Sequence, residues 1–98
     1  METNVELTQD LIEKWGEETQ IEMIIESAIK LSLSLQEFKR SDKNEDYNEY
    51  VNSYNDTCSK IAEMKLMLEQ SEYIFNKIEI DKHHDLMVKH LKDKLNEY

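Results

Sequence analysis

The chain has no proline, one glycine and one cysteine among its 98 residues. Strand-rich folds need many turns, and turns draw on glycine and proline, so this composition argues against a sandwich or a barrel. The single cysteine excludes an internal disulfide framework and suits a reducing compartment. No apolar run approaches the roughly eighteen residues of a membrane span, and the first residues lack the pattern of a signal peptide. We therefore expect a cytoplasmic protein without a membrane partner.

Positive charge is also scarce. Twelve basic and twenty-two acidic side chains give a formal net charge of −10 at pH 7. Such a surface repels phosphate backbones, which argues against direct nucleic-acid binding. The acidity is compatible with divalent cations or with a basic surface on a partner protein. Its ordinary explanation is a solvated surface that keeps the protein soluble.

Apolar residues recur at steps of three and four along most of the chain, which predicts an all-α fold in a single domain, residues 1–98. Residues 1–4 are expected to fray, and residues 5–15 are expected to form a short helix. Gly16 stands where that helix would end, because glycine adopts the left-handed backbone conformation without a steric penalty.

Three further helices complete the expected architecture. The second spans about residues 20–39, with its apolar residues on one stripe. Residues 41–46 are polar and aperiodic, which predicts a loop in which Asp42 or Asn44 caps the third helix. Asp81 is the expected cap of the last helix. Four helices in one bundle is the economical arrangement.

Two stretches of the chain carry a family resemblance. Their residues are Trp15-Gly16, Gln20, Met23, Glu26, Ala28, Leu31 and Phe38-Lys39-Arg40, followed by Ile61-Ala62, Met67-Leu68-Glu69-Gln70 and Ile74-Phe75. In this order they resemble the MazG-like, all-α nucleoside triphosphate pyrophosphohydrolases, over about residues 12–40 and 59–95. The resemblance implies a four-helix MazG-like bundle that forms a dimer or a tetramer.

The resemblance also locates a metal site. Family members hold magnesium with an E-x-x-E on one helix and an E-x-x-D on a facing helix, and the metal activates the water that releases pyrophosphate. Here the corresponding positions carry Ser27, Lys30, Lys60 and Glu63, so three of the four lack a carboxylate. A lysine ammonium has no lone pair to offer a metal. We therefore expect a degenerate, non-hydrolytic member with no metal and no other cofactor.

The two lysines at these positions have two interpretations. Glu26 and Lys30, and likewise Asp56 and Lys60, are i,i+4 pairs in the favourable orientation. Lys30 and Lys60 would then supply the positive charge once given by the metal and close the site with ion pairs. In the other interpretation they are ordinary solvated lysines, worth about 0.3–0.5 kcal/mol each.

An enzymatic alternative stays open at this point. Glu22 and Glu26 are one helical turn apart, and Asp56 and Glu63 would be able to face them from the other helix. These four carboxylates would form a displaced magnesium site. The chain would then be an active magnesium-dependent pyrophosphohydrolase that converts a nucleoside triphosphate to the monophosphate and pyrophosphate.

A candidate partner surface lies at the start of the third helix. It consists of Tyr47, Tyr50, Tyr54, Glu45, Asp46 and Glu49. Tyrosine is enriched at protein interfaces, because its large apolar ring carries a polar tip. An exposed face of this kind would suit a basic host protein. The alternative is that the rings pack inside the bundle.

The histidines and the cysteine give weaker candidates. His83 and His90 share a helix face but are seven residues apart, too far to chelate one metal without other ligands. Cys58 lies on an apolar stripe among acidic residues, which indicates a small core residue rather than a nucleophile. We expect no metal site from these residues.

Taken together, these patterns favour a non-hydrolytic binding or regulatory module. A narrower interpretation is a small acidic protein of a phage or mobile element that inhibits a host nucleic-acid enzyme or defence system. Self-association is expected because the apolar stripes are wider than one neighbouring helix would cover.

Overall fold

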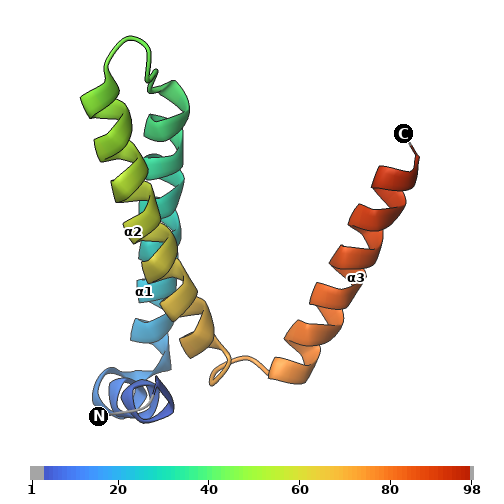
Figure 1. Ribbon diagram of the computed structural model, residues 1–98. Coiled ribbons are helices and arrows are strands. Elements are labelled where there is room, and N and C mark those ends of the chain that lie inside the picture. The colour runs from blue at the N-terminus through green and yellow to red at the C-terminus, as the bar shows by residue number, and fades with distance from the viewer. Residues whose placement is uncertain (1–3, 98) are drawn as a thin grey trace.

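The computed structural model describes residues 4–97, which form three helices and, within that range, no strand (Figure 1). They are α1 (Asn4–Arg40), α2 (Tyr47–Ser71) and α3 (Lys77–Asn96). The all-α prediction is confirmed. The fraying expected for residues 1–4 falls mostly outside the described residues, and Asn4 is the first residue of α1.

A break at Gly16 divides α1 into two segments. Its backbone angles are φ 82° and ψ 164°, a conformation that side chains other than glycine strongly disfavour. The sequence predicts a helix end at this residue, but helical structure resumes immediately after the single residue. The helix end predicted at Gly16 is present as this break, but the expected count of four helices is not confirmed, because only one residue separates the two segments of α1.

The second part of α1 and the whole of α2 form an antiparallel hairpin, joined by residues 41–46 (Figure 1). The cap of α2 is Asp46, whose Oδ1 accepts a hydrogen bond from the Glu49 N–H at 3.0 Å. The prediction of Asp42 or Asn44 as the cap is wrong. Asp42 instead accepts a hydrogen bond from the Asn44 N–H at 2.8 Å. This bond lies within the connection and does not cap α2.

α3 begins earlier than expected and packs against neither α1 nor α2 in the part of the chain that the structure describes. Its cap is Asn76, which accepts the Ile78 N–H at 2.8 Å, so the prediction of Asp81 is wrong. Figure 1 shows α3 diverging from the hairpin. The radius of gyration is 17.3 Å, whereas a compact chain of this length has about 13 Å. The structure therefore departs from a closed bundle.

The contact between α1 and α2 is a polar seam. The side chains that line it and are buried are Gln20, Ser27 and Ser34 of α1 and Thr57 and Gln70 of α2. Met67 is the one large apolar side chain buried among those that the structure describes. Most apolar side chains of the hairpin consequently lie outside the interface that joins its two helices.

Among the described residues, none of the helices is both long enough and apolar enough to cross a membrane.

Replacing Gly16 by alanine tests the break in α1. In a regular helix this change would stabilise the protein by about 1 kcal/mol. At φ 82° we expect the opposite sign, a loss of about 1–3 kcal/mol, because alanine is strained in this conformation. Chemical denaturation followed by circular dichroism measures the difference. A stabilised Gly16→Ala variant would contradict the break.

Candidate functional site

Ser27 and Glu63, two of the four family-derived metal positions, lie opposite each other across the seam. The Ser27 Oγ donates to Glu63 Oε1 at 3.4 Å, and Ser27 is only 4% exposed. Glu63, the one carboxylate among the four positions, is therefore engaged by a hydroxyl from the facing helix. The contact therefore brings Ser27 of α1 next to Glu63 of α2.

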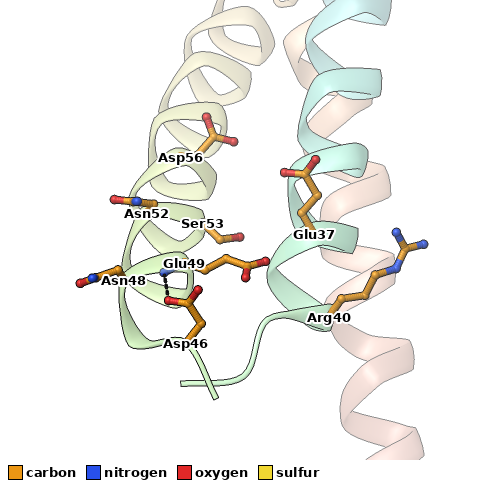
Figure 2. Close-up of a pocket in the computed structure, with 8 residues that line it drawn as sticks. All are labelled: Glu37, Arg40, Asp46, Asn48, Glu49, Asn52, Ser53 and Asp56. Carbon is orange, nitrogen blue, oxygen red and sulfur yellow. Dashed lines mark hydrogen bonds between the residues drawn. The ribbon is translucent and has the colours of Figure 1, made fainter. Parts of the chain in front are cut away.

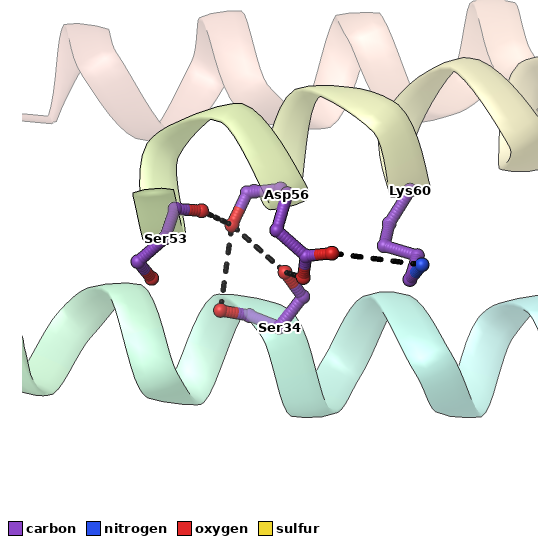
Figure 3. A network of polar contacts seen from close by, with 5 residues as sticks. Ser34, Ser53, Asp56 and Lys60 are labelled. Carbon is purple, nitrogen blue, oxygen red and sulfur yellow. Dashed lines mark hydrogen bonds and ion pairs between the residues drawn. The ribbon is translucent and has the colours of Figure 1, made fainter. Parts of the chain in front are cut away.

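One heptad along the seam, Ser34 is the centre of a second polar network (Figure 3). Its Oγ donates to Asp56 Oδ2 at 2.7 Å and lies 2.9 Å from Thr57 Oγ1. The Ser34 hydroxyl has one proton, and it donates this proton to Asp56. The Thr57 hydroxyl therefore donates either to Ser34 Oγ or to the Ser53 carbonyl, which is 2.8 Å away. This network fixes the rotation of both helices about their axes.

Lys30 and Lys60 lie at positions that the resemblance assigns to a metal site, and they differ in their ion-pair contacts. The Lys60 Nζ is 3.6 Å from Asp56 Oδ1, so Lys60 makes the predicted i,i+4 ion pair (Figure 3). Lys30 is exposed, and no ion pair joins it to Glu26, although both residues are described by the structure. Its placement fits the solvated interpretation. Lys60 fits the ion-pair interpretation, with an energy limited by the solvent exposure of its partner.

The carboxylates of the enzymatic alternative are not brought together. Asp56 lies opposite Ser34, and Glu63 lies opposite Ser27. Seven residues of helix separate these two carboxylates by about 10 Å along α2, whereas magnesium binds oxygen at about 2.1 Å. Glu22 and Glu26 are exposed on α1. Residues 4–97 contain no group of three or more acidic, histidine or cysteine side chains arranged to hold a metal ion.

An acidic hollow of about 830 Å³ opens near the hairpin connection (Figure 2). Its lining side chains are Glu37 and Arg40 of α1, Asp46 before α2, and Asn48, Glu49, Asn52, Ser53 and Asp56 of α2. Asp46 is used as the helix cap and Asp56 is bonded to Ser34. Figure 2 shows Glu49 extending toward α1. All four carboxylates contribute negative charge to the hollow, and Glu37 and Glu49 are the two that neither cap the helix nor bond to Ser34.

The structure divides the predicted partner surface between two faces of α2. Asp46 and Glu49 line the hollow. Tyr50 and Tyr54 instead pack against Phe38, with ring centroids 5.3 and 6.0 Å apart. At 100° per residue, Tyr54 is about 140° around the helix from Glu49.

The remaining members of that surface are exposed. Tyr47 is 66% exposed, on the side of α2 away from Glu49, and Glu45 lies in the connection before the helix. The tyrosines and the carboxylates consequently do not form one continuous site.

The histidines and the cysteine remain isolated. His83 and His90 are exposed on α3, like the rest of the final helical turns. Cys58 is exposed as well, which contradicts the prediction of a core position. Its neighbour Thr57 is buried in the seam, and Cys58 lies about 100° around α2 from it.

Sequence reasoning missed the seam itself. Gln20, Ser27 and Ser34 recur every seven residues, a spacing that places them on one face of α1. That repeat was a usable signal, since small polar side chains allow two helices to approach closely. It is obscured in the sequence by the neighbouring isoleucines and leucines, which mark the face adjacent to the seam.

Comparison of the chain with protein-family models, with curated proteins and with solved structures gives no match.

A double-mutant cycle tests the second network. We expect Ser34→Ala and Asp56→Ala to show a coupling free energy of about 0.5–1.5 kcal/mol, the net worth of a typical intramolecular hydrogen bond, because the half-exposed Asp56 carboxylate is partly solvated. Ser32→Ala is the matched control, because Ser32 is exposed on the same helix and the change in helix propensity is identical. Its cycle with Asp56→Ala is expected to be additive. Equal coupling for both serines would contradict the observed seam.

Proposed function

We propose that the chain is a non-hydrolytic, MazG-like binding or regulatory module that binds a basic surface of a partner protein. The observation that carries this proposal is the Ser27–Glu63 contact. At the place where the resembling family has paired carboxylates, this chain has a buried hydroxyl donating to the one carboxylate that remains. A carboxylate bonded in this way, beside Lys60 rather than a second acid, does not provide a magnesium site.

The acidic hollow supports the binding part of the proposal. It combines four carboxylates with one guanidinium near the connection that joins α1 to α2. Clusters of one sign attract oppositely charged partners and accelerate their association. A basic segment of a partner protein is the complementary ligand, whereas nucleic acid would be repelled by the net charge of −10.

The same residues support more specific proposals about assembly, location and biological role. We propose a homo-oligomer that acts in the cytoplasm and needs no cofactor. In its narrowest form, the protein belongs to a phage or mobile element and inhibits a host nucleic-acid enzyme or defence system. Its small size, its acidity and its altered catalytic positions support this form of the proposal.

Pyrophosphate release from the ribo- and deoxyribonucleoside triphosphates, with magnesium and then with manganese, tests the absence of hydrolysis. We expect no rate above the protein-free blank, since the chain offers no cluster of carboxylates at these positions. The revertant Ser27→Glu, Lys30→Glu, Lys60→Glu restores the four acidic positions and is measured beside it. Metal-dependent release by the natural chain that disappears in Glu63→Gln would overturn the proposal.

Binding of a fluorescent octa-arginine peptide tests the hollow. We expect the double variant Glu37→Gln, Glu49→Gln to bind about fivefold more weakly, the effect of losing two exposed ion pairs. Glu22→Gln, Glu72→Gln is the matched control, because it removes the same charge from exposed positions outside the hollow. Equal weakening in both variants would mean that net charge alone attracts the peptide, and would contradict a site in the hollow.

A further inference from the structure

The apolar side chains of this chain lie mainly on its surface. The large apolar side chains that are more than a third exposed are Trp15, Ile25, Ile29, Leu33, Leu35, Tyr47, Tyr54, Ile61, Leu68, Tyr73, Phe75, Ile78, Leu86, Met87, Val88, Leu91 and Leu95. Soluble monomers rarely expose contiguous apolar surface on this scale, and where it occurs it marks an interface.

The exposed area has the size of an obligate interface. The chain exposes 8108 Å², whereas a compact monomer of 11.8 kDa exposes about 5,900 Å². The excess is about 2,200 Å² per chain. A standard interface buries about 800 Å² on each partner, and obligate homodimers bury about 2,000–5,000 Å² in total. Two copies that covered the excess would therefore fall in the obligate class.

One side of the hairpin forms a continuous apolar face. We define the apolar face as Ile24, Ala28, Leu31 and Leu35 of α1 with Tyr54, Ile61 and Leu68 of α2. At one end of the apolar face, the Tyr54 ring packs on Phe38. At the other end, Ile24 and Leu68 line a hollow of about 600 Å³ together with Phe75 and Ile80.

α3 presents a matching stripe. Ile80, Met87, Leu91 and Leu95 share one face of this helix, and we call them the α3 stripe. They span about 22 Å at 1.5 Å per residue, and Tyr54 to Leu68 on the apolar face spans about 21 Å. Ile80 borders the hollow at the end of its own chain's apolar face. The rest of the stripe has no partner helix within the described chain.

Charge selects α3, rather than a second hairpin, as the occupant of the apolar face. Five lysines and five acidic residues follow Asn76, so the entire net charge of −10 lies on residues 1–76. Pairing two hairpins face to face would bring two strongly acidic units together. A neutral helix that carries five lysines approaches the same face without this repulsion.

The turn before α3 directs the helix away from its own hairpin. The Phe75 N–H donates to the Ser71 carbonyl at 2.8 Å, and the Ile74 N–H donates to the same carbonyl at 3.0 Å. Asn76 then caps α3. These bonds hold the divergence seen in Figure 1, so α3 does not lie on the apolar face of its own chain.

We propose that α3 of one copy packs its stripe on the apolar face of a second copy, and reciprocally, to form an intertwined dimer with two-fold symmetry. The proposal rests on the self-association proposed above and adds the two surfaces that make it. Reciprocal exchange uses the same pair of surfaces twice, as a closed two-fold interface requires.

Leu91→Lys and its matched control Leu86→Lys test the stripe by light scattering and sedimentation. Both leucines are exposed on α3, by 59% and 52%, but Leu86 lies about 140° around the helix from Leu91. We expect twice the mass of 11.8 kDa for the natural chain and for Leu86→Lys. Leu91→Lys should raise the dimer dissociation constant at least about tenfold.

Photo-cross-linking shows which chain α3 contacts, even if Leu91→Lys fails to fold. Benzoylphenylalanine replaces Val88, beside the stripe, in an unlabelled chain that is mixed with ¹⁵N-labelled natural chain. We expect cross-links to isotopically heavy peptides of α1 and α2.

Two outcomes would overturn the exchange. Light cross-links alone, with a monomeric mass, would mean that α3 folds onto its own hairpin, and self-association would fail as well. A dimer whose cross-links avoid the apolar face would overturn the exchange but leave self-association in place.

Discussion

A polar seam holds α1 against α2, and the rest of the structure depends on it. Gln20, Ser27 and Ser34 repeat every seven residues, so one face of α1 meets α2 through small or amide side chains. Hydrogen bonds across the seam fix the register of the two helices, but each contributes only about 1 kcal/mol net. Burial of apolar side chains is normally the main source of folding free energy, yet most of those in the hairpin lie beside the seam and remain at least partly exposed. The hairpin therefore needs a second apolar surface.

The same seam separates the two surfaces for which we propose partners, one on each side of the hairpin. On one side, the acidic hollow carries Glu37 and Glu49 and is suited to a basic partner. On the other, the apolar face is suited to α3 of a second copy. The Ser27–Glu63 contact joins two positions that the resemblance assigns to a metal site.

The spacing of the apolar residues predicts the helices well, because residues at steps of three and four form a continuous stripe only on a helix. The break at Gly16 was also predictable, since few other residues adopt that backbone conformation. The start of α3 was not: Asn76 and Asp81 are both good capping residues, and no glycine or proline marks the end of α2. The candidate metal positions came from the resemblance and stay a prediction. A wide apolar stripe does not reveal which part faces the neighbouring helix, so the role of Ser34 was missed.

The proposed dimer couples folding to association, and the dependence of thermal unfolding on protein concentration tests this coupling. A folded state that exists only as a dimer becomes more stable as the chain concentration rises. Circular dichroism over roughly a hundredfold range of concentration should therefore show a melting temperature that rises steadily. A melting temperature independent of concentration, with the full helix content of a monomer, would contradict the claim, because it would show that the single chain is stable with its apolar face uncovered.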